Sequence, residues 1–131
     1  MKLEQMEVIL SIKPEFAKKI FEGSKKFEFR RTLFKSQNVE KVIVYASSPI
    51  SKVIGEFEIE NIYFENIDSL WEFTKEFSGI SKKYYIDYFE GKTSGYALEV
   101  KKPVLYKDFL SIVDVYGIKP PQSFAYYSKE R

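Results

Sequence analysis

The sequence contains no cysteine and no histidine, and these two absences remove several classes of mechanism. There is no disulfide, no thiol nucleophile, no Cys/His zinc site and no histidine base. No apolar run approaches the roughly 18 residues of a membrane-spanning helix, and residues 1–5 lack the apolar core of a secretion signal. We therefore expect a cytoplasmic protein with no membrane span, no metal and no other cofactor.

A strong net charge is also lacking, since 21 Lys and Arg residues against 19 Asp and Glu residues leave +2. The charges are unevenly distributed along the chain. Residues 18–35 hold seven cationic and two acidic side chains, a net of +5, whereas residues 56–90 hold nine acidic side chains and three lysines, a net of −6. This asymmetry indicates a molecule with one positive side.

The 131 residues are 44% hydrophobic, which is typical of a globular chain, and we expect a single domain over residues 1–131. Aromatic content is high, with 12 Phe and 10 Tyr. Ten tyrosines exceed what a small core needs, so some of them are expected to line a groove or an interface.

The most ordered local pattern lies in the N-terminal third of the chain. Residues 6–12 predict a buried strand, and Pro14 is suited to the first position of the helix expected over residues 14–22. Gly23 stands where a left-handed helix cap is wanted. Residues 25–31 then alternate as a strand with Phe27 and Phe29 on one face and three charged side chains, Lys26, Glu28 and Arg30, on the other.

The rest of the chain predicts further strands and shorter helices. A loop is expected over residues 32–40, strands over 41–46, 53–64 and 94–102, a helical turn over 108–113, and a final segment over 124–127. Gly55 is expected at a β-bulge or where another part of the protein approaches the backbone closely. Asp68 and Ser81 are expected to cap helices, and Pro103 is expected to end the strand over residues 94–102. These elements indicate an α+β fold, a small, mostly antiparallel β-barrel with helices packed at its ends.

The strand after Gly23 is the main candidate site. Glu28 and Arg30 lie two residues apart, so both can reach one ligand. The Arg30 guanidinium can pair with a phosphate or a base edge, and Glu28 can accept from an exocyclic amine or act as a base. The alternative interpretation is a solvated strand face with weak ion pairing.

Three further patterns have both a functional and a purely structural interpretation. The segment from Ser47 to Pro49 can present hydroxyls and N–H groups to a phosphate, or be an ordinary turn. Three carboxylates on one strand can bind a hard cation, but more simply form the wet face of that strand; they are Glu56, Glu58 and Glu60. Aromatic residues near the strand ends can stack a base or pack the barrel end; they are Tyr45, Phe124, Tyr126 and Tyr127. A second group at helical spacing is interpreted mainly as core: Tyr84, Tyr85, Tyr88 and Phe89.

Three motifs of the sequence stand out together: Leu10-Ser11-Ile12-Lys13-Pro14, Gly23-x-Lys25-x-x-Glu28-x-Arg30, and Tyr45-Ala46-Ser47-Ser48-Pro49. In these motifs the chain resembles the ASCH family, part of the PUA-like superfamily of small β-barrels. The resemblance extends through Gly55-Glu56-Phe57 and Tyr96-Ala97 to Pro121-Gln122-Ser123-Phe124. The resemblance implies a PUA-like barrel with a cleft beside the first helix that binds RNA or modified nucleosides. The residues expected at that cleft are Lys13, Lys25, Glu28, Arg30, Tyr45, Ser47, Ser48, Gln122 and Phe124.

The family resemblance also implies two enzymatic activities as expectations. One branch removes the acetyl group of N4-acetylcytidine with a lysine, a threonine and a glutamate, and ribonuclease activity is associated with other members. Lys25 matches the lysine, Glu28 occupies the threonine position, and Glu76 is the candidate for the glutamate. Because Glu28 favours the charged form of Lys25 and so opposes its use as a base, binding ranks ahead of catalysis.

The sequence alone is thus compatible with three functions. The first is binding of RNA or a nucleotide-like ligand. The second is hydrolysis of a nucleoside amide or of RNA, by Lys25, Glu28 and Glu76. The third is a protein-interaction domain with exposed tyrosines at the contact.

Overall fold

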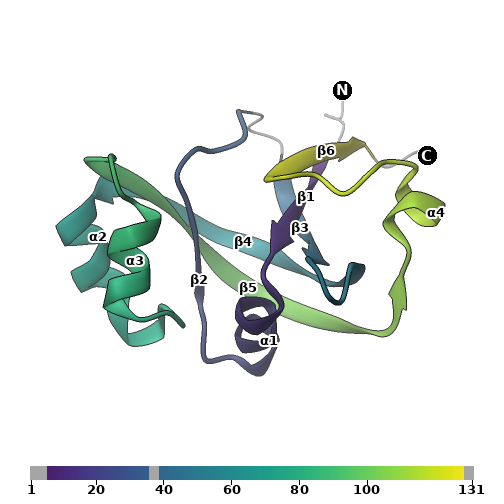
Figure 1. The fold of residues 1–131 in the computed structure, drawn as a ribbon, viewed down its shortest axis with the longest axis horizontal. Helices are drawn as coiled ribbons and strands as arrows, with labels where there is room; N and C mark the ends of the chain where they lie inside the picture. The colour runs from purple at the N-terminus through teal and green to yellow at the C-terminus, as the bar shows by residue number, and fades with distance from the viewer. Residues whose placement is uncertain (1–5, 36–38, 129–131) are drawn as a thin grey trace.

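The computed structural model describes residues 6–35 and 39–128, which form an α+β fold (Figure 1). Its strands are β1 (Met6–Ile12), β2 (Phe27–Arg30), β3 (Val39–Ala46), β4 (Lys52–Asn66), β5 (Ser94–Leu110) and β6 (Phe124–Ser128). Its helices are α1 (Pro14–Glu22), α2 (Ile67–Thr74), the 3₁₀ turn η1 (Lys75–Phe77), α3 (Lys82–Tyr88) and α4 (Ile112–Tyr116). The expected α+β class is confirmed.

The six strands form one sheet in the order β2-β5-β4-β3-β1-β6. Only β1 and β3 run parallel; the other described neighbours are antiparallel, as expected. In the described part of the chain, the outer strands β2 and β6 are not paired with each other, yet the Arg30 side chain of β2 reaches Ser123, next to the start of β6. The sheet therefore curves until its edges are one side chain apart, and a fully closed barrel stays a prediction.

The β1–α1–β2 unit follows the sequence pattern closely. Lys13 is extended, Pro14 opens the helix, and Gly23 closes it with a φ of 92°. The Gly23 N–H donates to the carbonyls of Lys19 and Ile20, which satisfies groups that the helix end would leave unpaired. This left-handed cap turns the chain back so that β2 begins beside the helix that it follows.

Three apolar clusters hold the elements together. The largest lies inside the curved sheet and includes α1, with Ile20, Val44 and Phe57 fully buried. A second cluster joins α2 and α3 to the β2–β5 end of the sheet around Tyr85 and Phe89. The third lies beneath α4 around Ile112. Helices therefore cover separate parts of the sheet (Figure 1).

Gly55 lies at a shift in the β3–β4 and β4–β5 registers, as expected from the sequence. A Cβ added there would stand 2.4 Å from the Val104 carbonyl oxygen and 2.6 Å from the Phe21 ring, so only glycine fits the close approach of strand and helix.

Three local expectations were wrong. The cap of α2 is Asn66, whose side chain accepts from the Ser69 N–H at 2.8 Å, and not Asp68. Strand β5 does not end at Pro103 but continues to Leu110. Pro103 lies where the β4–β5 pairing shifts in register, so its missing N–H does not interrupt a regular row of hydrogen bonds. The turn expected over residues 108–113 is instead the end of β5 followed by α4, which Ser111 caps.

One expected helix cap is confirmed. Ser81 caps α3, since its hydroxyl accepts from the Tyr84 N–H at 3.0 Å. The loop expected over residues 32–40 is shorter because β3 starts at Val39, and residues 36–38 lie outside the described residues. Within residues 6–35 and 39–128, no helix has both the length and the apolar character needed to cross a membrane.

Candidate functional site

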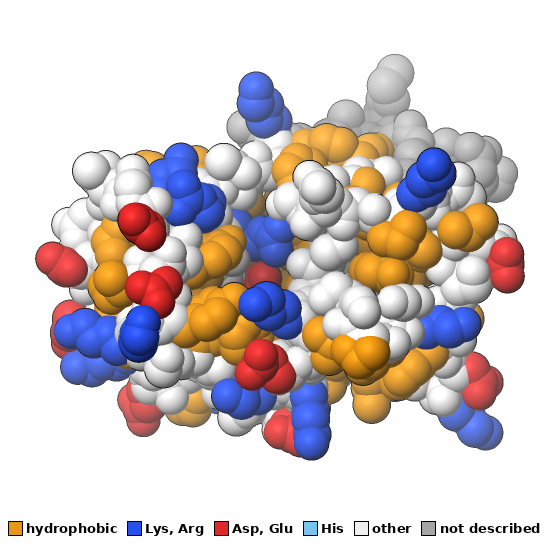
Figure 2. All heavy atoms as spheres, viewed as in Figure 1, with side chains coloured by type: hydrophobic (Ala, Val, Ile, Leu, Met, Phe, Trp, Pro, Cys, Tyr) orange, Lys and Arg blue, Asp and Glu red, His pale blue; other side chains and the backbone are white. Residues whose placement is uncertain are grey.

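A cavity of about 400 Å³ lies where β1, α1, β2, α3 and the segment before β6 meet. This is within the size range of small-ligand pockets. Figure 2 shows the hollow near the centre of this face, with cationic and acidic atoms at its bottom. The lining residues are Ser11, Ile12, Lys13, Phe16, Lys25, Glu28, Phe29, Arg30, Ser47, Ile80, Tyr84, Tyr88, Gln122 and Ser123.

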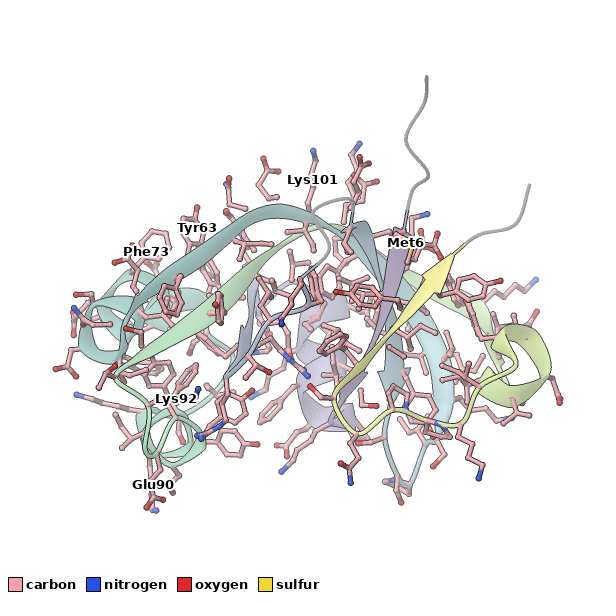
Figure 3. The ribbon with its side chains drawn as sticks, turned by 90° about the horizontal axis from the view of Figure 1, so that it is seen from above. Met6, Tyr63, Phe73, Glu90, Lys92 and Lys101 are labelled. Atoms are coloured by element: carbon pink, nitrogen blue, oxygen red, sulfur yellow. The ribbon has the colours of Figure 1, made fainter. Side chains whose placement is uncertain are left out.

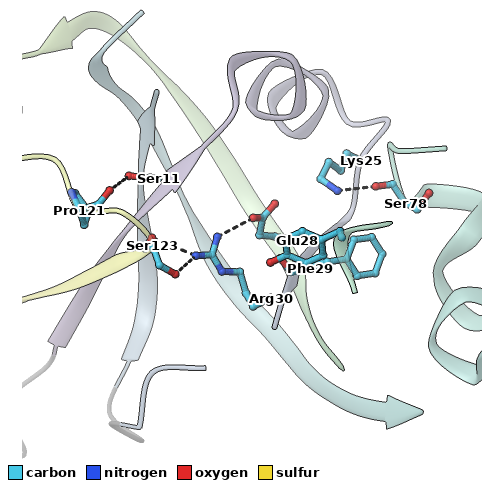
Figure 4. A network of polar contacts seen from close by, with 9 residues as sticks. Ser11, Lys25, Glu28, Phe29, Arg30, Ser78, Pro121 and Ser123 are labelled. Atoms are coloured by element: carbon cyan, nitrogen blue, oxygen red, sulfur yellow. Dashed lines mark hydrogen bonds and ion pairs between the residues drawn. The ribbon is translucent and has the colours of Figure 1, made fainter. Parts of the chain in front are cut away.

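Glu28 and Arg30 form a buried ion pair on the cavity wall (Figure 4). Arg30 Nη1 lies 3.2 Å from Glu28 Oε2, and the two residues are only 8% and 7% exposed. Arg30 Nη2 also donates to the Ser123 carbonyl oxygen, at 3.2 Å, and to its hydroxyl. The interpretation as a solvated strand face is therefore wrong: the guanidinium is fixed on two sides in a site shielded from water.

Lys25 is the second buried cation of the cavity and is 2% exposed. Its Nζ donates to the Ser78 carbonyl oxygen at 2.6 Å and lies 4.9 Å from the centre of the Phe29 ring. Burial lowers the pKa of Lys25 to about 8, although Glu28 acts to raise it and Lys19 adds a smaller lowering effect. Glu28 thus acts on the pKa of Lys25 in the direction expected from the sequence, but burial has the larger effect, so the net pKa is lowered.

Aromatic side chains of α1 and α3 form one wall of the cavity. Phe16 of α1 and Tyr84 of α3 pack edge to face at 5.0 Å between ring centres. The Tyr88 hydroxyl donates to the Phe29 carbonyl oxygen at 3.1 Å, and burial raises the pKa of Tyr88. The sequence interpretation assigned the aromatic residues of α3 mainly to the core. Tyr85 and Phe89 are indeed buried in it, but Tyr84 and Tyr88 line the cavity.

Polar residues of three separate segments form the rim. Lys13 is exposed at the start of α1, with its Nζ 5.3 Å from the centre of the Tyr84 ring. Ser47 follows β3, and Gln122 precedes β6. The Ser11 hydroxyl donates to the Pro121 carbonyl oxygen, which fixes the approach of the chain to β6 beside the cavity (Figure 4).

Six of the residues expected from the sequence thus line one cavity: Lys13, Lys25, Glu28, Arg30, Ser47 and Gln122. Four others do not line it. Tyr45 is buried in the cluster beneath α4, because the register of β3 turns it to the other side of the sheet. Phe124 packs against Phe34 at 6.0 Å between ring centres. Ser48 is exposed in the turn after β3, and Glu76 is exposed in η1.

The carboxylates of β4 have their own partners. Glu56 lies 3.0 Å from Lys41 Nζ and accepts from the Tyr106 hydroxyl at 2.6 Å, while Glu60 lies 3.8 Å from Lys101 Nζ. In residues 6–35 and 39–128, no three carboxylates are grouped as ligands of a metal ion. These carboxylates are therefore better described as the solvent-facing side of β4 than as a cation site.

The chemistry of the cavity combines three cations, one carboxylate, hydroxyl groups and aromatic rings. Guanidinium and ammonium groups bind phosphate, and flat aromatic faces stack planar rings. A lysine with a pKa of about 8 is partly neutral near physiological pH and can accept a proton. The arrangement suits a ligand that has a planar ring and a phosphate.

Comparison with known proteins gives consistent matches. The ASCH domain model matches residues 10–110. An ASCH domain-containing ribonuclease from Zymomonas mobilis is 31% identical over 130 residues, a match covering 97% of this chain and 88% of that protein. The crystal structure of ASCH from Zymomonas mobilis has a TM-score of 0.83 at 29% identity and covers 94% of this chain and 88% of that one.

A further relative is much longer than this chain. The large ribosomal subunit protein uL22 of Ureaplasma parvum is 33% identical over 119 residues, which make up 91% of this chain but only 38% of that protein. The family-model match and the similarity along nearly the whole Zymomonas ribonuclease lead to one assignment: the chain belongs to the ASCH domain family.

Proposed function

We propose that this chain acts on RNA and that the cavity holds one nucleotide of a single-stranded segment. The supporting observation is the joint placement of Lys13, Lys25 and Arg30 around a cavity with an aromatic wall. A guanidinium has five N–H donors, and Arg30 uses three of them in hydrogen bonds to Glu28 and Ser123. Its remaining donors can bind a phosphate oxygen while the base lies against Tyr84.

Binding is tested by fluorescence anisotropy with a labelled single-stranded hexauridylate at several salt concentrations. If phosphates are contacted, the affinity falls with salt, with a log–log slope of about −0.7 for each phosphate neutralised. Lys13→Gln is the informative variant because Lys13 is exposed and its loss leaves the core intact. Lys18→Gln is the matched control, since Lys18 is an exposed lysine of the helix that follows Lys13 and does not line the cavity.

We expect Lys13→Gln to weaken binding and to reduce the salt slope, and Lys18→Gln to leave both nearly unchanged. Equal effects of the two variants would mean that the protein attracts RNA by its overall charge and not through this cavity. Absence of hexauridylate binding at low salt would end the proposal.

Cleavage of RNA is a second candidate, favoured by the lowered pKa of Lys25 and by the ribonuclease name of the Zymomonas relative. In this reaction the 2′-hydroxyl oxygen bonds to the adjacent phosphorus and gives its proton to the neutral Lys25 amine. The bond from phosphorus to the 5′-oxygen breaks, and that oxygen takes a proton from water; the hydroxide formed then takes the proton from the Lys25 ammonium, which restores the neutral amine. A 2′,3′-cyclic phosphate remains, and Arg30 stabilises the charge on the pentacovalent phosphorus.

Gel analysis of an end-labelled RNA tests cleavage. We expect fragments ending in a 2′,3′-cyclic phosphate, no cleavage of the same sequence as DNA, and loss of activity in Lys25→Met. Cleavage of the DNA at an equal rate would contradict attack by the 2′-hydroxyl. Full activity of the Lys25→Met variant would rule out Lys25 as the base.

Hydrolysis of N4-acetylcytidine is less well supported by the geometry. The position that holds a threonine in that branch is Glu28, whose carboxylate pairs with Arg30. The expected third residue, Glu76, is exposed and lies outside the cavity. Chromatography after incubation with N4-acetylcytidine should show no cytidine; its appearance, abolished by Lys25→Met, would replace the RNA proposal with an amidohydrolase.

A further inference from the structure

The structure has a further pocket besides the cavity at the candidate site, which we call the main cavity. The volume of this further pocket is about 380 Å³, and its lining includes Arg31, Thr32, Phe64, Lys92, Ser94 and Tyr96. These residues come from the chain that leaves β2, from the end of β4, and from the turn that leads from α3 into β5. We call this the Phe64 pocket.

Two aromatic rings form one side of the Phe64 pocket. Phe64 and Tyr96 face each other across the β4–β5 ladder, with ring centres 4.6 Å apart and planes inclined by 37°. Phe64 is 58% exposed although it is paired with a second ring. Such a surface can stack a nucleic-acid base, whatever its identity, because every base has a flat face.

The lining of the Phe64 pocket also includes two cations. Arg31 and Lys92 line the Phe64 pocket, and its lining includes no carboxylate. Arg31 Nη1 donates to the carbonyl oxygens of Tyr88 at 2.9 Å and Glu90 at 2.8 Å, which fixes the guanidinium at the end of α3. None of the ion pairs among residues 6–35 and 39–128 involves Lys92. Figure 3 shows Lys92 at the end of the molecule that carries α2 and α3, with Glu90 farther out.

The Phe64 pocket and the main cavity are structurally connected. Arg30, Tyr96 and Phe64 are register partners in one row across β2, β5 and β4. Two strand spacings place the ends of this row about 10 Å apart. Tyr88 also links the sites, since its side chain lines the main cavity and its carbonyl oxygen holds Arg31.

We infer that the Phe64 pocket is a second nucleotide subsite for the same single-stranded RNA. The base stacks on the Phe64–Tyr96 pair, and Arg31 and Lys92 bind the phosphate beside it. The inference rests on the proposed function, because it assigns a neighbouring nucleotide to an RNA that already occupies the main cavity. A ligand of one nucleotide fills the main cavity alone, and a longer RNA fills both.

The test compares two probes, uridine 5′-monophosphate and labelled hexauridylate. Phe64→Ala should weaken hexauridylate binding about fivefold or more, the loss expected when one stacked base is removed. Lys92→Gln should reduce the hexauridylate salt slope by about 0.7. Neither variant should change the affinity for uridine 5′-monophosphate.

Matched controls lie at the other end of β5. Phe109→Ala removes a phenylalanine that is 46% exposed, and Lys107→Gln removes an exposed lysine. Neither residue lines the main cavity or the Phe64 pocket, so neither control should change binding. Thermal unfolding of each variant checks its folding, and Lys92→Gln remains informative if Phe64→Ala fails to fold, because Lys92 is exposed.

The outcomes separate this inference from the proposed function. Hexauridylate binding that depends on Lys13 but is unchanged in Phe64→Ala and Lys92→Gln would overturn the second subsite and leave the main cavity as the RNA site. Equal weakening by the Phe64 and Phe109 variants would also overturn it. If wild-type protein binds neither probe, both proposals are overturned.

Discussion

Arg30 and Ser123 are 93 positions apart in the sequence, yet Arg30 Nη2 lies 3.2 Å from the Ser123 carbonyl oxygen. Arg30 ends one edge strand of the sheet, and Ser123 immediately precedes the other. The same guanidinium pairs with Glu28 and lines the main cavity. The contact that brings the two sheet edges together therefore also fixes a cation at the candidate site.

The first prediction separates these two roles of Arg30. Arg30→Met leaves the Glu28 carboxylate buried without its cation, so we expect the free energy of unfolding to fall by about 3–5 kcal/mol. Adding Glu28→Leu removes the unpaired charge and should recover much of that loss in urea unfolding. Hexauridylate binding should stay weak in both variants, because neither has the guanidinium.

The control for this experiment is Lys83→Met. Lys83 pairs with Asp87 at 3.0 Å, but the side chains are 86% and 64% exposed. Removal of such a surface pair costs about 0–1 kcal/mol. If the Arg30 variant lost no more stability than this control, the ion pair with Glu28 would not be buried as described.

The N-terminal third could be predicted because its signals are local. Pro14 begins α1, Gly23 ends it, and the alternation from Phe27 to Arg30 gives β2. Each signal acts within a few residues, so one sequence is enough to interpret it. The burial of Glu28 and Arg30 was not predictable in this way, because Ser123 and the residues of α3 that cover them come from later segments.

The aromatic wall of the main cavity shows the limit of helical periodicity. Tyr84, Tyr85 and Tyr88 follow one another in a short helix, and spacing alone assigns them to a single apolar face. The docking of α3 decides which of them meets the core and which meets the cavity. Tyr45 was misassigned for a related reason: strand alternation gives two faces but does not say which one faces the ligand.

The second prediction concerns the pH dependence of stability. The pKa of buried Lys25 is about 8, below its ordinary value of 10.5. As pH rises between these values, the folded protein releases the proton before the unfolded chain does, so the free energy of unfolding rises with pH. The full pKa difference of Lys25 corresponds to a change of about 3 kcal/mol in the free energy of unfolding.

Urea unfolding between about pH 7 and 9.5 measures this rise and stays below the pH at which unfolded tyrosines ionise. Burial raises the pKa of Tyr85, which causes the opposite trend at higher pH. Lys25→Met should abolish the rise, whereas Lys18→Met, at an exposed lysine, should retain it. A wild-type stability that is flat over this range would contradict the lowered pKa.

The third prediction tests the aromatic wall. Tyr84→Ala should weaken hexauridylate binding about fivefold or more, as expected for loss of one stacked base. Tyr84→Phe keeps the ring and should bind nearly as well as wild type. If the phenylalanine variant lost as much affinity as the alanine variant, the hydroxyl and not the ring of Tyr84 would be the contact.

The fourth prediction concerns the support of Lys25 by Gly79. Gly79 has a φ of +70°, and a Cβ added there would stand 2.6 Å from both Cβ and Cγ of Lys25. These atoms belong to the fixed base of a side chain whose Nζ is held by the Ser78 carbonyl oxygen, so they cannot move away easily. We expect Gly79→Ala to combine backbone strain with overpacking and to displace Lys25 in the main cavity.

Gly117→Ala isolates the backbone contribution. Gly117 has the same φ of +70°, but an added Cβ would meet nothing within 4 Å. Gly117→Ala should lower the free energy of unfolding by about 1–2 kcal/mol, for the left-handed conformation alone. Gly79→Ala should lower it by about 1–3 kcal/mol more, because of overpacking. Urea unfolding measures this difference, and only Gly79→Ala should also weaken hexauridylate binding. Equal losses of stability in the two variants would mean that Lys25 does not rest on Gly79.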